Sequence, residues 1–93
     1  MKVKNVEKRI WHLEGFDVVI RNDNGRDVHG HRSDFPPYDY TYQAKHNMTV
    51  GDWKRTRFKS KYIGFEVDVL DAEGDIVPGQ TKLSTVRDTY LGE

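Results

Sequence analysis

The sequence predicts a small α+β domain in which a mixed or antiparallel sheet of four to five strands packs on one helix. The alternative is a small all-β barrel or sandwich. Three observations lead to this prediction: the chain has 93 residues, enough for one domain with a modest core; several short segments alternate apolar and polar residues, as strands do; and one central segment carries a helix-start signal. We therefore expect residues 1–93 to form a single domain, with disordered ends at 1–7 and 91–93.

The first strand is predicted from Phe16 to Asn22, because Phe16, Val18 and Ile20 alternate along one face. Residues 22–25, Asn-Asp-Asn-Gly, tolerate the left-handed conformations of a tight turn and predict a hairpin, whose return arm at 26–30 is weak. Residues 30–37 are predicted to form a loop, since the two prolines at 36 and 37 cannot donate ladder hydrogen bonds.

A second strand is predicted at 38–44, where Tyr38, Tyr40 and Tyr42 share one face. The opposite face carries Asp, Thr and Gln, so the tyrosine row is the more apolar of the two. We expect this row to contribute to the core, with an exposed contact surface as the alternative.

Residues 49–62 are compatible with two structures. As a helix, the segment starts at Thr49 as N-cap, with Asp52 three residues later. As a hairpin with a turn at Ile63-Gly64, it would pair Lys61 with Glu66 and Lys59 with Asp68. A β-branched residue such as Ile63 fits poorly at a positive φ, so the helix is favoured over the hairpin.

The C-terminal third is predicted to return to strands. Residues 65–70, Phe-Glu-Val-Asp-Val-Leu, alternate apolar with other residues, and residues 71–74, Asp-Ala-Glu-Gly, form a turn. A short strand at 75–77 and a last extended segment at 83–90 would complete the sheet.

This order of elements resembles the β-grasp arrangement of ubiquitin-like domains. The resemblance depends on the Thr49-Val50 helix start, on the strand at 65–70, and on Gly74 followed by residues 79–84, Gly-Gln-Thr-Lys-Leu-Ser. It covers roughly residues 14–91. It implies a fold and no specific activity.

Composition limits the classes of function. The chain has no cysteine and therefore no disulfide or thiolate chemistry, and we expect a cytoplasmic protein. Its formal net charge is +0 and its isoelectric point about 6.9, without the basic excess that is usual for nucleic-acid-binding domains. No apolar run is long enough to suggest a membrane span.

The strongest candidate for function is a basic and aromatic segment at 38–62. It holds six Lys or Arg against two Asp, whereas residues 63–80 hold five Asp or Glu and no cation. Cations neutralise phosphates and aromatic rings stack on bases, but the same cations can pair with the acidic segment that follows. The candidate interaction residues are Tyr38, Tyr40, Tyr42, Trp53, Lys54, Arg55, Arg57, Lys59 and Lys61.

No catalytic, cofactor or metal motif is evident. His29 and His31 lie on one side of an extended segment, but no second cluster with ligand spacing accompanies them. The three serines lack a nucleophile elbow, and a nucleophilic triad is unsupported. We predict that the chain is not an enzyme and needs neither cofactor nor metal.

The sequence thus predicts a small non-catalytic protein-interaction module, with a nucleic-acid-binding domain that uses 38–62 as the alternative. The expected contact face carries Trp53, Arg55, Arg57 and Lys59, and the acidic turn at 71–75 is a second candidate. An exposed strand edge would recruit a protein partner or form a dimer, so we expect a monomer or weak homodimer.

Overall fold

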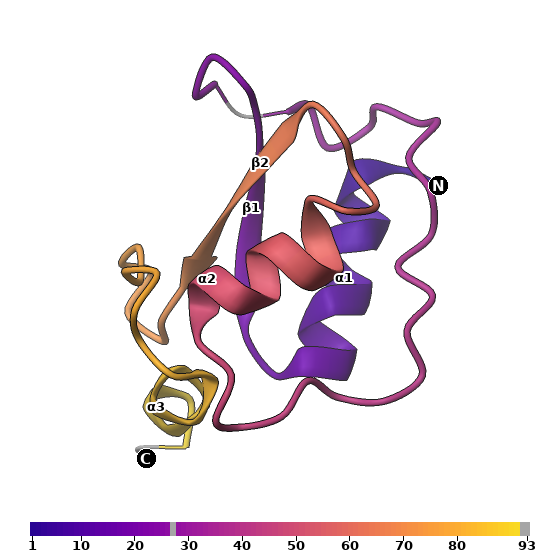
Figure 1. Ribbon diagram of the computed structural model, residues 1–93. Helices are drawn as coiled ribbons and strands as arrows, with labels where there is room; N and C mark the ends of the chain where they lie inside the picture. Colours follow the sequence, from indigo (N-terminus) through magenta and orange to yellow (C-terminus); the bar gives the residue numbers. More distant parts are fainter. Residues whose placement is uncertain (27, 92–93) are drawn as a thin grey trace.

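The computed structural model describes residues 1–26 and 28–91. In these ranges three α-helices and one π-helical segment accompany a two-stranded sheet, and the long segment between the first strand and the second helix runs around the outside of the first helix (Figure 1). The elements in chain order are α1 (Val3–Glu14), β1 (Asp17–Asn22), α2 (Val50–Trp53), η1 (Lys54–Phe58), β2 (Phe65–Leu70) and α3 (Leu83–Thr89).

Helix α1 replaces the disordered N-terminal end that the sequence predicts. Val3, Val6 and Ile10 follow the helical repeat and are fully buried, so one apolar stripe holds the helix to the core. The helix ends at Gly15, whose φ of 84° provides a left-handed cap and whose N–H donates to the Trp11 carbonyl at 3.0 Å. The expectation of disorder at 1–7 is therefore wrong for residues 3–7. The disorder predicted at 92–93 falls outside the described residues.

Strands β1 and β2 pair antiparallel, with Val18 opposite Val69 and Ile20 opposite Val67 on the core face. The predicted sheet of four to five strands is wrong, because no other strand occurs in 1–26 and 28–91. The helices also exclude the all-β alternative, whereas the broader α+β class is compatible with the structure. The β-grasp resemblance fails with the strand count.

Three predicted strands are missing, and the one predicted at 75–77 is reduced to an isolated bridge between Ile76 and Leu70. Residues 38–44 form neither helix nor strand. Residues 83–90 form α3 instead of an extended segment, because Leu83 and Val86 are three residues apart and are both buried. The N–H of Leu83 donates to the Met48 carbonyl at 2.8 Å, which satisfies a group that the start of the helix leaves without an internal partner.

Several local predictions are confirmed. The Thr49 side chain caps α2 by accepting the Asp52 N–H at 3.1 Å, so the helix is present and the hairpin alternative is wrong. β2 spans the predicted residues, and the turn after it closes with Gly74 at φ 84°. The turn after β1 is also present, with the Gly25 N–H donating to the Asn22 carbonyl at 2.9 Å.

The helix beyond Trp53 widens into the π-helical segment η1, in which the Lys59 N–H donates to the Lys54 carbonyl at 2.7 Å. Trp53 and Phe58 are five residues apart, more than one α-helical turn. The wider π-helical turn directs the Trp53 and Phe58 side chains toward the core, with ring centroids 6.3 Å apart. Trp53, Phe58 and Tyr62 are all buried.

No helix in the described part of the chain is long and apolar enough to cross a membrane.

Substitution of Ile10 by Ala tests the contribution of α1. The side chain is fully buried, so the truncation removes apolar burial and leaves a cavity. We expect the free energy of unfolding, measured by urea denaturation, to fall by about 2–5 kcal/mol. Lys8→Ala, at an exposed position of the same helix, is the matched control and should change stability by no more than about 0.5 kcal/mol. Equal effects of the two substitutions would contradict the placement of α1.

Candidate functional site

A buried carboxylate at the end of α1 gathers most of the aromatic and cationic residues that the sequence singles out. Glu14 is 0% exposed. Its Oε2 accepts hydrogen bonds from the Tyr38 hydroxyl at 2.5 Å and from an Arg57 guanidinium nitrogen at 2.9 Å. Its Oε1 accepts from the Ala44 N–H at 2.9 Å and from Arg87 at 3.1 Å. Both carboxylate oxygens are therefore fully hydrogen-bonded inside the protein.

Trp53 closes this arrangement from α2. Its indole Nε1 lies 3.0 Å from the Tyr38 hydroxyl oxygen and 3.4 Å from Glu14 Oε2. Burial, the hydrogen bond to Glu14 and the Glu14 charge raise the pKa of Tyr38 well above its usual range. Tyr38 thus acts as a neutral donor. The side chains of Glu14, Tyr38, Trp53, Arg57 and Arg87 are called the Glu14 cluster below.

Arg57 is held in place by contacts within the protein. Its guanidinium lies 4.5 Å from the centroid of the Tyr40 ring and donates to the Tyr42 carbonyl at 2.6 Å. Burial alone would lower the pKa of Arg57, but contacts with Tyr38 and Glu14 outweigh burial and leave the pKa raised. Arg57 is therefore a permanent positive charge beside Glu14.

Arg87 connects α3 to the cluster. Its Nε donates to the Glu14 carbonyl at 2.6 Å and one terminal nitrogen donates to the Ala44 carbonyl at 2.9 Å. The same nitrogen lies 3.1 Å from His46 Nδ1. Burial lowers the pKa of Arg87, and the Glu14 charge partly offsets that effect. An arginine remains charged under these conditions, because its ordinary pKa lies far above neutrality.

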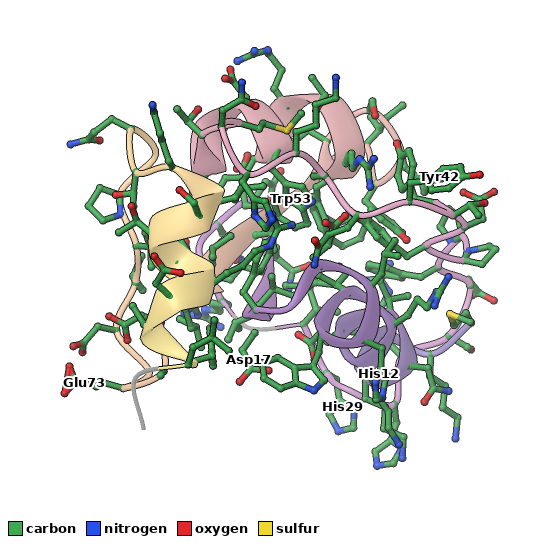
Figure 2. All side chains as sticks on the ribbon, turned by 90° about the horizontal axis from the view of Figure 1, so that it is seen from below. His12, Asp17, His29, Tyr42, Trp53 and Glu73 are labelled. Atoms are coloured by element: carbon green, nitrogen blue, oxygen red, sulfur yellow. The ribbon has the colours of Figure 1, made fainter. Side chains whose placement is uncertain are left out.

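The chemistry of the Glu14 cluster is structural. A carboxylate, two guanidiniums, a phenol and an indole hydrogen-bond to one another, and they join the end of α1 to the 38–46 segment, to η1 and to α3. Tyr38 and Trp53 are 1% and 0% exposed, so neither ring can contact a partner. Figure 2 shows Trp53 enclosed among other side chains, whereas Tyr42 projects from the surface.

The tyrosine row predicted at 38–44 does not act as one surface. Tyr38 is buried, Tyr40 is partly buried against the core, and Tyr42 is 79% exposed. The core interpretation is therefore confirmed for Tyr38, whereas Tyr42 is exposed and its contact role stays a prediction.

Three of the four remaining predicted cations also have internal partners. Arg55 pairs with Asp52 at 2.6 Å, Lys59 with Glu66 at 2.7 Å, and Lys61 with Asp39 at 2.7 Å. Lys54 is partly buried on the same helix. Both Arg55 and Lys59 remain substantially exposed, so they keep the capacity for outward contacts that the sequence assigned to them.

Sequence reasoning missed Glu14 and Arg87, the two residues that link the ends of the cluster. Glu14 lies four residues after Ile10 on the apolar stripe of α1, and a carboxylate on such a stripe indicates a buried ion pair. That signal depends on recognising α1. No local pattern identifies its partner Arg87, which is 73 residues away in the sequence.

An apolar groove adjoins the Glu14 cluster. It has a volume of about 430 Å³ and is called the α1–α3 groove; its lining residues are Trp11, Gly15, Gln43, His46, Arg87, Tyr90 and Leu91. The Trp11 and Tyr90 rings meet edge to face, with centroids 5.1 Å apart. Trp11 is 37% and Leu91 77% exposed, so large apolar side chains face solvent here.

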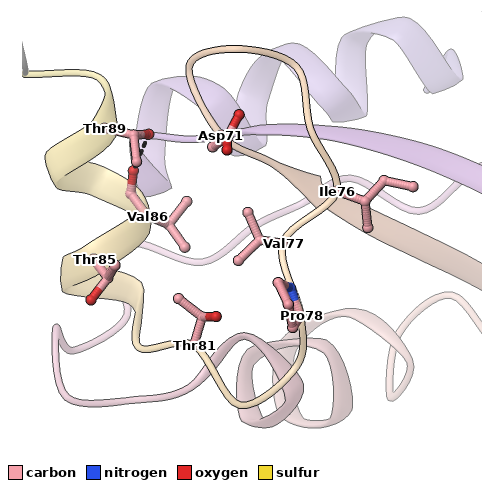
Figure 3. Close-up of a pocket in the computed structure, with 8 residues that line it drawn as sticks. All are labelled: Asp71, Ile76, Val77, Pro78, Thr81, Thr85, Val86 and Thr89. Carbon is pink, nitrogen blue, oxygen red and sulfur yellow. Dashed lines mark hydrogen bonds between the residues drawn. The ribbon is translucent and has the colours of Figure 1, made fainter.

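Two other cavities are less open to a ligand-binding interpretation. The smaller, of about 160 Å³, lies between α3 and the 71–81 loop (Figure 3). Two of its polar side chains are already hydrogen-bonded: the Thr89 hydroxyl donates to the Val86 carbonyl, and an Asp71 oxygen accepts two N–H groups of its own turn. The other, of about 270 Å³, is lined in part by Arg32, Phe35 and Phe65, and Arg32 lies over both rings.

Two potential metal clusters also have structural explanations. Carboxylate oxygens of Asp71, Glu73 and Asp75 lie within 4.8 Å of one another in an exposed turn that the Asp71 side chain itself stabilises. His29 accepts the His31 N–H through Nδ1 at 3.1 Å. The charges of Lys4 and Lys2 lower the pKa of His31, and the same charges oppose a metal cation.

Comparisons of the chain with protein-family models, with curated proteins and with solved structures found no match. The functional argument therefore depends on the geometry of this chain.

Substitution of Glu14 by Gln tests the cluster. Glutamine keeps the shape but removes the charge, which leaves two guanidiniums buried without their counter-ion. We expect the free energy of unfolding in urea to fall by about 3–5 kcal/mol. Glu73→Gln, in an exposed turn, is the control and should be nearly neutral. A loss for Glu14→Gln no larger than that of the control would contradict the assigned role.

Alkaline unfolding tests the buried phenols. Burial raises the pKa of both Tyr38 and Tyr62, with added contributions from Glu14 for Tyr38 and from Asp39 and Tyr40 for Tyr62. The unfolded chain therefore loses these protons first. The stabilisation is complete below the ordinary pKa of 10.0 and is lost as pH rises through the higher folded values.

The measurement is circular dichroism followed together with phenolate absorbance. The Tyr62 hydroxyl has no hydrogen-bond partner in the described structure, so Tyr62→Phe removes an ionising group without breaking a bond. We expect the alkaline midpoint to move to higher pH in this variant. An unchanged midpoint would show that Tyr62 ionisation does not drive the transition.

Proposed function

We propose that this chain is a small non-catalytic protein-interaction module that binds its partner in the α1–α3 groove. The observation that carries the proposal is one apolar hollow lined by the exposed side chains of Trp11 and Leu91 and by the partly buried ring of Tyr90. Tryptophan and tyrosine dominate the binding energy of protein interfaces because they bury large, rigid surfaces. Two of the three side chains are such rings.

The geometry moves the proposed surface away from the face predicted from the sequence. Trp53 is buried and Arg57 is committed to Glu14, so the face of Trp53, Arg55, Arg57 and Lys59 offers only its outer cations. The groove presents rings that are accessible and already positioned. Their edge-to-face contact restricts both, which lowers the entropy lost on binding.

The rigid foundation of the groove supports the same proposal. Its floor is formed in part by Arg87, which is held by hydrogen bonds to Glu14 and Ala44. A partner would therefore meet a surface that is formed in advance, as in pre-organised protein complexes. The proposal retains a cytoplasmic location, for which the absence of cysteine is the compositional support. It also retains a monomeric or weakly dimeric chain.

Nucleic-acid binding through 38–62 has less geometric support. Two of its best stacking rings, Tyr38 and Trp53, are buried, and four of its cations are paired with carboxylates: Arg55, Arg57, Lys59 and Lys61. Phosphates would have to displace those carboxylates before any counterion release favoured binding.

A peptide-display selection on the immobilised full chain tests the proposal. Selected peptides should lose at least about thirtyfold in affinity for Trp11→Ala, because interface tryptophans typically contribute 2 kcal/mol or more. Tyr42→Ala, which removes an exposed ring outside the groove, is the matched control and should leave affinity unchanged. Thermal melts verify that both variants are folded.

Two results would contradict the proposal. One is selected peptides whose affinity depends on Arg55 or Lys59 and not on Trp11. The other is no selected peptide at all, together with salt-sensitive shifts at residues 38–62 on addition of a mixed single-stranded oligonucleotide, which would support nucleic-acid binding.

A further inference from the structure

The Glu14 cluster carries an uncompensated positive charge next to the α1–α3 groove. One carboxylate, Glu14, faces two guanidiniums, Arg57 and Arg87, and in the described part of the chain neither guanidinium pairs with a second carboxylate. Both arginines are largely shielded from water, with side chains 19% and 8% exposed. A charge in such surroundings is screened far less than a surface charge. The excess positive charge therefore acts on a ligand in the groove, because Arg87 lines it.

Arg87 also has hydrogen-bonding capacity left. A guanidinium has five N–H groups. Four are used, by the Glu14 carbonyl, the Glu14 carboxylate, the Ala44 carbonyl and His46. Within the described residues the fifth, on the nitrogen that contacts Glu14, has no protein partner. Since Arg87 lines the groove, this donor belongs to a side chain that a ligand would contact.

His46 adds a second donor at the edge of the groove. Arginine donates and never accepts, so the contact at 3.1 Å requires His46 Nδ1 to accept the hydrogen bond. The imidazole proton must then be on Nε2, on the side of the ring away from Arg87. His46 is exposed and lines the groove, so Nε2–H is available to a ligand.

Three other residues that line the groove are apolar. Trp11, Tyr90 and Leu91 offer apolar surface and no charge. The volume of about 430 Å³ lies within the roughly 300–1,000 Å³ typical of sites that enclose a short segment or small ligand. An occupant that matches both halves needs a negative group beside an apolar side chain.

We propose that the α1–α3 groove recognises a partner segment in which a carboxylate is adjacent to an aliphatic or aromatic side chain. This inference rests on the proposed function and names the chemistry of its partner. The carboxylate is held by Arg87 and His46 Nε2–H and balances the excess charge of the Glu14 cluster. The apolar side chain packs against Trp11, Tyr90 and Leu91.

The test is an amide and indole chemical-shift titration of the full chain with two capped tetrapeptides, acetyl-Gly-Leu-Asp-Gly-amide and its Asn counterpart. The pair differs only in charge and one donor group. We expect the Asp peptide to bind about tenfold more tightly, as a charge-assisted hydrogen bond would give. The Trp11 indole signal should shift with both peptides. The advantage of Asp should shrink as salt rises from about 0.05 M to about 0.5 M.

Variants separate a role in recognition from a role in folding. His46→Ala should reduce binding of the Asp peptide more than that of the Asn peptide, whereas a purely structural defect would weaken both equally. His12→Ala removes an exposed histidine of α1 that does not line the groove, and it should change neither affinity.

Several other results would overturn the inference. Equal binding of both peptides at Trp11 would overturn the carboxylate inference and leave the groove as a protein-binding surface. Shifts confined to Arg55 and Lys59, or no shift at Trp11 with either peptide, would overturn it as well. Shifts at Trp11 that depend on protein concentration without peptide would assign the groove to a second copy of this chain and overturn the inference.

Discussion

Burial of the Glu14 carboxylate is the constraint on which the rest of the structure depends. A charge removed from water is costly unless it is paired and fully hydrogen-bonded, so three separate segments must supply its partners. Tyr38 and Ala44 come from the segment without regular structure, Arg57 from η1, and Arg87 from α3. A two-stranded sheet is only marginally stable alone, and these cross-connections tie the irregular segment and α3 to α1.

The same carboxylate explains why the basic and aromatic segment has a structural role. Tyr38, Trp53 and Arg57 have the chemistry of a phosphate-binding surface, but each of them is also a strong donor to a buried anion. Desolvation strengthens these interactions relative to contacts at the surface. Residue types that suggest nucleic-acid binding in a sequence therefore serve here to compensate one internal charge.

Patterns within a few residues predicted local structure, whereas no pattern in the sequence indicated which residues far apart in the chain would pair. The Thr49 cap and the alternation of Phe65–Leu70 are complete within a few residues, and both were correct. The N-terminal helix was not predicted, although Val3, Val6 and Ile10 have helical spacing. Helix α3 was mistaken for a strand because its β-branched threonines and valine favour strands, whereas burial of Leu83 and Val86 decides otherwise.

The site also depends on long-range contacts that local sequence patterns do not predict. The sequence identified Arg57 but not Glu14 or Arg87, so the sign of the local charge could not be calculated. Only their contact in three dimensions shows that two cations share one anion. A second internal carboxylate would have balanced the charge of the cluster, but it would also have left the adjacent groove without charge preference. The imbalance is a cost to the isolated chain that a carboxylate supplied from outside can remove, and this couples the energetics of the core to the chemistry of the groove.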